Sequence, residues 1–193
     1  MRQSRQSCSA SGEAEVALSP VLEVVRTYLE LRSLAQLRAS PIPDAGVRVV
    51  RRASITAEHY RRLYRAVGDA WYWHDRNAWS DQRLLRHLAA PDVAVWECLV
   101  HDETAGFFEL QRNDDGSVEI AYFGLVAAFM GRGIGKALLS RAAEEAWNFG
   151  ASRVWLHTCT LDSPQALPNY RARGFEEVRT EKYVVQIPET HKD

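Results

Sequence analysis

The feature that most limits how this chain can fold is a glycine-rich turn between a strand pattern and a helix pattern. Apolar residues alternate along residues 118–125, which predicts a half-buried strand. Glycines follow at alternate positions within Met130–Lys136. Apolar residues then recur at helical spacing over Gly133–Phe149, and Gly150 is placed to end that helix as a left-handed cap. The turn therefore leads a strand directly into a helix without a side-chain cap.

Such a turn is suited to hold a phosphate group. The first turn of a helix has N–H groups without partners and a partial positive charge. Glycines let the backbone approach an anion with no side chain in between, and Arg132 and Lys136 add positive charge. A pyrophosphate would fit here. A flexible strand-to-helix turn without a ligand is the alternative interpretation of this loop alone.

The surrounding sequence excludes two common phosphate-binding arrangements. A Walker loop needs Ser or Thr directly after its lysine, whereas Lys136 is followed by Ala137. A dinucleotide-binding fold needs parallel βαβ units from the start. Strand patterns at 93–100, 106–111 and 118–125 are instead joined by short, hairpin-like connections. We therefore predict an antiparallel meander before the turn.

Helix and strand patterns on either side complete a mixed α/β architecture. Thr56 is placed to cap a helix that runs to Gly68, and Ser80 to cap a shorter one that ends before Pro91. After the long helix we expect a buried strand at 152–158, a helix at 163–173 and one or two closing strands at 176–187. Pro168 lies inside the last of these helices, where it should kink the turn.

The N-terminal part divides into two segments. Residues 1–20 are predicted to be a disordered tail. Residues 21–37 fit both a strand and a helix, and we favour a strand, so that 21–45 form an N-terminal extension that adds a strand. Residues 46–52 are expected to be the first strand of the core. Residues 46–193 then form a single domain, because 193 residues are long enough for one well-buried domain and too short for two.

Composition and charge exclude several classes of protein. The net charge is −1, whereas nucleic-acid binders carry a basic excess, so we expect no nucleic-acid partner. The apolar runs are too short to cross a membrane, and the N-terminus lacks the apolar region of a secretion signal. The 3 cysteines have no metal-type spacing and favour a reduced setting. We therefore predict a cytoplasmic protein without a metal or membrane partner, as a monomer or homodimer.

Together with a second motif, the glycine turn resembles the signature of the GNAT superfamily of N-acetyltransferases. Family members carry Gln/Arg-x-x-Gly-x-Gly/Ala after the fourth core strand, and residues 130–135 read Met-Gly-Arg-Gly-Ile-Gly. Met130 replaces Gln or Arg, which removes one side-chain contact but keeps the backbone N–H groups. The second motif is matched by Asp162, where the family has Asn, and by Ala166, Tyr170 and Gly174-Phe175. The resemblance covers residues 46–187.

The resemblance implies a fold, a co-substrate and a set of binding residues. The expected fold is GNAT-like α/β (α+β), with a mixed, mainly antiparallel sheet of about seven strands flanked by about four helices. The expected co-substrate is acetyl-coenzyme A (acetyl-CoA), used without a metal. The residues expected to bind it are Leu125, Val126, Ala127, Met130, Gly131, Arg132, Gly133, Ile134, Gly135, Lys136, Asp162, Ala166 and Tyr170.

Acetyl transfer to an amine needs a base, because an amine attacks a thioester only as the free base. A lysine-like amine has a pKa of about 10.4, and a positioned base contributes about 10²–10⁴ in rate. Glu119 lies on the strand before the turn, where family members that acetylate histones place their base; it fits a surface strand residue equally well. Glu109 is the next candidate, followed by His157 and His74.

The transfer also needs donors for the leaving thiolate and for the carbonyl oxygen. Tyr170 matches the family's general acid, since a phenol with a pKa of about 10 can protonate or hydrogen-bond a thiolate. A core tyrosine packed on the sheet is the alternative interpretation. In the family that the chain resembles, a backbone N–H between the fourth and fifth strands stabilises the carbonyl oxygen, which implies Leu125 or Val126 as the donor here. Cys159 is an unfavourable covalent nucleophile, because a buried thiol is usually inert.

The acceptor amine is the least constrained part of the prediction. Trp71 and Trp73 lie in a loop where aromatic faces would suit a cationic amine, although they fit core positions equally well. With Glu109 and His157 they are the candidate substrate-binding residues. We predict direct transfer, in a ternary complex, to a primary amine of a small molecule or peptide. A non-catalytic acyl-CoA-binding module and a protein acetyltransferase are the alternatives.

Overall fold

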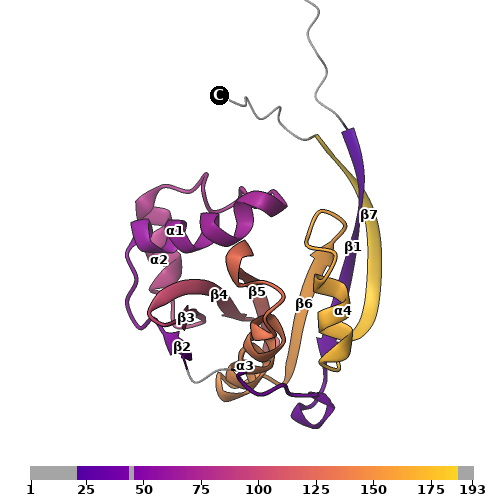
Figure 1. The fold of residues 1–193 in the computed structure, drawn as a ribbon. Helices are drawn as coiled ribbons and strands as arrows, with labels where there is room; N and C mark the ends of the chain where they lie inside the picture. The colour runs from indigo at the N-terminus through magenta and orange to yellow at the C-terminus, as the bar shows by residue number, and fades with distance from the viewer. Residues whose placement is uncertain (1–20, 44–45, 187–193) are drawn as a thin grey trace, which may run out of the picture.

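The computed structural model describes residues 21–43 and 46–186 (Figure 1). The predicted tail at 1–20 lies outside the described residues, as do 44–45 and 187–193. The strands are β1 Val21–Leu31, β2 Val47–Arg51, β3 Val93–Val100, β4 Glu103–Arg112, β5 Ser117–Leu125, β6 Arg153–Cys159 and β7 Glu176–Gln186. The α-helices are α1 Ala57–Gly68, α2 Asp81–Leu88, α3 Ile134–Asn148 and α4 Ala166–Ala172. Short 3-10 turns lie at η1 Leu34–Gln36, η2 Asp69–Trp71 and η3 Ala127–Phe129.

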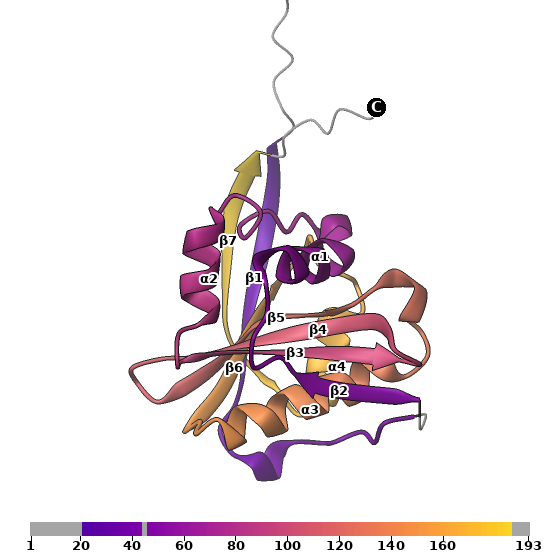
Figure 2. The ribbon, with the colours of Figure 1, turned by 90° about the vertical axis from the view of Figure 1, so that its left-hand side faces the viewer.

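The strands form one 7-stranded sheet in the order β2-β3-β4-β5-β6-β1-β7. Every neighbouring pair is antiparallel except β5 and β6, which are parallel. The β6-β1-β7 part runs steeply across β2–β5, as expected from accumulated strand twist (Figure 2). The predicted mixed, mainly antiparallel sheet flanked by helices is therefore confirmed.

Helices cover both faces of the sheet because β3 and β4 alternate their side chains between two apolar clusters. On one face, Val95 and Phe107 pack with α1 and α2 residues such as Tyr60. On the other face, Trp96 and Phe108 belong to the cluster that contains the apolar side of α3. Figure 2 shows α1 and α2 above the strands β3–β5 and α3 below them. None of the helices within 21–43 and 46–186 combines the length and apolar character needed to cross a bilayer.

The predicted helix ends are confirmed by hydrogen bonds. Thr56 Oγ1 accepts from the His59 N–H at 3.1 Å at the start of α1, and Ser80 Oγ accepts from the Arg83 N–H at 3.3 Å at the start of α2. At the end of α3, the Gly150 N–H donates to the Trp147 carbonyl at 3.0 Å, and the following residue closes the six-residue turn of a Schellman motif. Local sequence therefore determines where these helices begin and end.

The position of β1 differs from the predicted order of strands. The strand favoured within residues 21–37 is present as β1, which lies between β6 and β7 and is antiparallel to both. The strand expected within residues 46–52 is also present, as β2, and it lies at one edge of the sheet. Leu29 and Leu31 of β1 are fully buried, because strands on both sides and helices on one face exclude water from them.

Pro168 does not interrupt α4, contrary to expectation. We expected a helix from 163, which would place the proline in its interior, but α4 begins at Ala166 with Gln165 as its N-cap. The first helical hydrogen bond runs from the Asn169 N–H to the Gln165 carbonyl at 3.1 Å. The N–H that proline lacks would have had no partner in this first turn, so the helix loses no hydrogen bond.

Substitution at β1 should show that this strand is an interior element of the fold. Leu29 is 0% exposed and Val21, on the same strand, is 59% exposed. We expect Leu29→Ala to lower the free energy of unfolding by about 2–5 kcal/mol, because it leaves a cavity. Val21→Ala should lower it by about 0.5 kcal/mol or less. Urea unfolding midpoints measure both, and equal midpoints would contradict the interior position of β1.

Candidate active site

A cleft of about 990 Å³ opens where β5 and β6 separate. The two strands pair only through Ser117–Glu119 of β5. Immediately beyond, Glu109 faces Tyr122 while Leu110 faces Ile120, so β5 carries a bulge at Ala121. Beyond Glu119, β5 therefore has one edge without a neighbouring strand, and the cleft lies along it.

The glycine turn forms one end of the cleft. Gly131 and Gly133 have φ of +75° and +77°, values that residues with a Cβ rarely adopt. Gly133 is the N-cap of α3 and supplies no capping side chain. Of the predicted binding residues in this turn, Met130, Gly131, Gly133, Gly135 and Lys136 line the cleft. Arg132 instead lies over the Phe129 ring, and Ile134 is buried in the core.

This turn fits a phosphate-bearing cofactor. A Cβ built on Gly131 would meet nothing within 4 Å, so open space lies next to its backbone. The 15-residue helix α3 starts here with first-turn N–H groups that lack helical partners. Lys136 adds a cation at the same end. The observed backbone therefore leaves open space and unpaired N–H groups at the start of α3, which are the features that an anion site needs.

The two candidate donors for the carbonyl oxygen, the backbone N–H groups of Leu125 and Val126, face in different directions. The Val126 N–H donates to the Ala105 carbonyl at 2.9 Å and is therefore engaged in the sheet. Hydrogen bonds of an antiparallel pair alternate along a strand, so the backbone groups of Leu125 and Phe123 point away from β4, towards the cleft. Leu125 lines the cleft, whereas Val126 and Ala127 are outside its lining.

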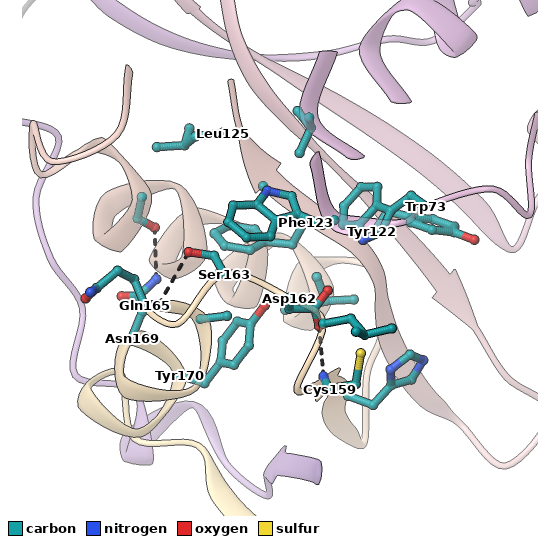
Figure 3. A pocket seen from close by; sticks show the side chains of 18 of the residues that line it. Trp73, Tyr122, Phe123, Leu125, Cys159, Asp162, Ser163, Gln165, Asn169 and Tyr170 are labelled. Atoms are coloured by element: carbon teal, nitrogen blue, oxygen red, sulfur yellow. Dashed lines mark hydrogen bonds between the residues drawn. The ribbon is translucent and has the colours of Figure 1, made fainter. Parts of the chain in front are cut away.

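Tyr170 lies in the wall opposite that edge. It is 6% exposed, and its ring makes edge contacts with Phe123 and Phe175 at centroid distances of 6.1 and 6.2 Å. Its hydroxyl end points into the cleft (Figure 3). Burial, with a smaller contribution from the Asp162 carboxylate, raises the pKa of the Tyr170 phenol. The phenol therefore keeps its proton at neutral pH and can act as a donor.

Other cleft residues order the turns around Tyr170. Asp162 accepts hydrogen bonds from the Thr158 hydroxyl at 2.8 Å and the Cys159 N–H at 2.9 Å, which fixes the turn after β6. Asn169 Nδ2 donates to the Gly135 carbonyl at 3.4 Å and so connects α4 to the first turn of α3. Ala166 also lines the cleft. The motif did not indicate Asn169, although it directly precedes the predicted tyrosine.

Glu119 is the last residue of β5 that pairs with β6, and it lines the cleft. Burial, together with the charge of Glu109, raises the pKa of the Glu119 carboxyl to about 7, against opposing effects of Arg76 and Arg26. His157 Nε2 is 3.9 Å from Glu119 Oε1. Desolvation in the cleft and the charge of Arg26 lower the pKa of His157. The Glu119 carboxyl can therefore exchange a proton near neutral pH, whereas the His157 imidazole is more readily neutral than a free one.

Glu109 has a different environment, although it lies on the neighbouring strand. It is 0% exposed and does not line the cleft. Its carboxylate accepts from Arg76 Nη2 at 2.9 Å and from the Tyr60 hydroxyl, and His87 Nε2 lies at 2.9 Å. Burial alone would raise the pKa of Glu109, but these partners outweigh it and lower that pKa. Glu109 therefore anchors Arg76 and the loop that carries it.

That loop forms the outer wall of the cleft. Trp71 and Trp73 line the cleft, and Trp73 packs against Tyr64 and Tyr122 at centroid distances of 5.5 and 5.2 Å. His74 lies outside the lining. Lining residues from distant segments that the sequence did not indicate include Arg26 of β1, Tyr122, Arg173, and Tyr183 and Val185 of β7. In the described ranges no group of His, Cys, Asp or Glu is arranged to hold a metal ion.

Comparison with known sequences decides the family. The sequence model of the acetyltransferase (GNAT) family matches residues 55–175, which include the glycine turn, Glu119 and Tyr170. This chain belongs to the GNAT family.

Two curated relatives illustrate the similarity and its extent. A mycothiol acetyltransferase from Corynebacterium efficiens is 31% identical over 118 residues, which cover 58% of this GNAT chain and 38% of the relative. An uncharacterised N-acetyltransferase from Mycobacterium tuberculosis is 31% identical over 77 residues, which cover 40% of this chain and 49% of the relative. The chain thus spans less than half the length of either relative.

Solved structures share the fold. A GCN5-related N-acetyltransferase from Kribbella flavida superposes with a TM-score of 0.62 at 19% identity, over 89% of this chain and 62% of that one. An aminoglycoside acetyltransferase from an uncultured soil metagenomic sample has a TM-score of 0.53 at 16% identity, over 67% of this chain and 88% of that one. At these identities the likeness shows a common GNAT fold.

Removing the charge of Glu109 should destabilise the protein. Glu109→Gln leaves the Arg76 cation buried without its counter-charge, so we expect the free energy of unfolding to fall by about 3 kcal/mol or more. The control is Glu144→Gln, since Glu144 is exposed and lies 3.8 Å from Arg141; its loss should cost less than about 0.5 kcal/mol. Urea unfolding followed by tryptophan fluorescence measures both. Equal midpoints would contradict the anchoring role.

Proposed function

We propose that this protein transfers an acetyl group from acetyl-CoA to a primary amine of a small molecule or peptide. The observation that carries this proposal is that one cleft contains the glycine turn, Tyr170 and Glu119. These groups correspond to a phosphate-binding site, a proton donor and a proton acceptor. Direct transfer requires all of these along one path.

Acetyl-CoA would supply an acyl group activated as a thioester. The chain's own groups would hold it in the narrow region between α3, α4 and β5. The backbone of Gly131–Lys136 would bind the pyrophosphate, with Lys136 adding charge. The free edge of β5 would offer the main-chain groups of Phe123 and Leu125 to the polar arm of the cofactor.

Glu119 is the proposed base for the acceptor amine. A carboxyl with a pKa of about 7 is half ionised at neutral pH, which favours proton acceptance near that pH. His157, 3.9 Å away, can take part in the same proton transfer. Glu109 is not suited to this role, because its carboxylate is already engaged and outside the cleft.

Two hydrogen-bond donors complete the proposed chemistry. Tyr170, with its raised pKa, would donate its proton or a hydrogen bond to the leaving thiolate. The Leu125 N–H would stabilise negative charge as it develops on the carbonyl oxygen. Burial, together with the Asp162 charge, raises the pKa of the Cys159 thiol. A protonated thiol is a poor nucleophile, which supports direct attack over a covalent acyl-enzyme.

Tyr170→Phe tests the proposed acid. This change removes only the hydroxyl, so we expect acetyl-CoA affinity by calorimetry to stay within about twofold while kcat falls by about 10² or more. The control for altered packing is Phe175→Leu, since the Phe175 ring makes an edge contact with Tyr170 but has no group that could donate a proton. This variant should retain most of the turnover. An unchanged kcat in Tyr170→Phe would remove this residue from the chemistry. An absence of acetyl-CoA binding in the wild type would refute the proposed function.

The pH dependence identifies the base. Glu119 must be ionised to accept a proton, so kcat/KM should rise with pH through an acid limb near 7, the value to which burial raises its pKa. His157 has a lowered pKa, so a limb set by this residue would lie below about 6.5. We expect Glu119→Gln to lose the limb near 7, whereas His157→Gln retains it. Retention of that limb in Glu119→Gln would exclude Glu119 as the base.

A further inference from the structure

We propose that the acceptor amine also carries a carboxylate and that Arg26 binds this carboxylate. The inference rests on the proposed function and names the class of acceptor. Arg26 lines the cleft from β1, which the pairing register places opposite Cys159 on β6 and Glu181 on β7. Arg26 therefore lies one strand beyond β6, which carries His157. Glu119 and His157 mark the part of the cleft where the acceptor amine is proposed to bind, which we call the acceptor side.

Arg26 has unused hydrogen-bonding capacity. Its Nε is buried and has no hydrogen-bond partner. Nη1 lies 3.5 Å from Glu181 Oε1, and Nη2 donates to the Tyr183 hydroxyl at 3.3 Å, both long distances for such bonds. A guanidinium has five donor hydrogens in a planar fork that matches a carboxylate. A bound carboxylate would use donors that the protein itself leaves weakly engaged.

Glu181 does not neutralise this region by itself. Its carboxylate also accepts from the Tyr28 hydroxyl at 2.7 Å and lies 3.6 Å from Arg179 Nη1. Two arginines thus share one carboxylate. Glu181 therefore compensates the charge of Arg26 only in part, which favours a second anionic partner for Arg26.

Arg76 also lines the cleft and also has a buried Nε without a hydrogen-bond partner, but its guanidinium is held in place. Arg76 donates to Glu109 at 2.9 Å, and its guanidinium lies over the rings of Trp79 and Tyr122 at 4.0 and 5.0 Å. Arg26 instead lies 4.8 Å from the centroid of one ring, Tyr183, at the cleft surface. Arg26 is thus the better placed of the two to bind a ligand.

A carboxylate fits this environment better than a phosphate monoester. Glu181 is in contact with Arg26, and Arg26 is near enough to Glu119 to lower its pKa. These acidic groups would repel a dianion more strongly than a monoanion. An acceptor with its amine at Glu119 and His157 and its carboxylate at Arg26 satisfies both ends. Amino acids and short peptides with a free carboxylate belong to this class.

Matched pairs of acceptors test the inference. The panel contains glycine, β-alanine, 4-aminobutyrate, 6-aminohexanoate and diglycine, each with its carboxamide, and kcat/KM is measured by thiol release with acetyl-CoA. We expect at least one acid to exceed its amide by about tenfold or more, the value of a hydrogen-bonded charge pair. Arg26→Ala should reduce the ratio of acid to amide to about one. Because the charge of Arg26 also acts on Glu119, this ratio is compared between proteins and not either rate alone, and circular dichroism checks that the variant is folded.

Two further variants sharpen the test. Arg26→Lys keeps the charge but loses the fork, so it should restore part of the preference. Arg141→Ala removes an exposed arginine on α3 and should leave the preference unchanged. Acids that never exceed their amides, or an Arg26→Ala variant that lowers both equally, would overturn the inference while acetyl transfer stands. Preference for O-phosphoethanolamine over β-alanine would overturn the carboxylate assignment. Transfer to no amine in a broad library would refute the proposed function as well.

Discussion

The separation of β5 from β6 is the constraint on which the site depends. Parallel pairing ends at Glu119, and the bulge at Ala121 turns β5 away from its neighbour. Main-chain groups that a continuous sheet would have paired are left facing a cleft. The same divergence makes room for the turn at Gly131–Lys136 on one side of that edge. The cleft proposed to bind a cofactor and an acceptor therefore arises from a local loss of sheet hydrogen bonds.

Two glutamates on adjacent strands show how environment separates residues of the same type. Glu109 is fully buried, but Arg76, His87 and Tyr60 keep it ionised and engaged. Glu119 has no such set of donors, so burial raises its pKa to about 7. Glu109 therefore holds the loop that carries Arg76 in place, whereas Glu119 is left able to accept a proton. Hydrogen-bond partners, more than depth of burial, decide this difference.

Much of the fold and part of the site follow from sequence over short distances. The caps at Thr56, Ser80 and Gly150 are fixed by contacts within a few residues, so local patterns predict them. The pattern of alternation predicts the meander for the same reason. The kink expected at Pro168 was wrong, because the effect of this proline depends on where α4 starts. The ends of a helix are set by packing as well as by local propensity.

The sequence by itself determined the glycine turn and the strand before it, because these depend on spacing along contiguous segments, and the resemblance to a family motif singled out Tyr170. Only the tertiary structure decided that β1 enters the sheet between β6 and β7 and so brings Arg26 into the cleft. Strand order and the partners of a buried charge depend on contacts between residues more than a hundred positions apart. No local pattern encodes such contacts, because they form only when the whole sheet is assembled.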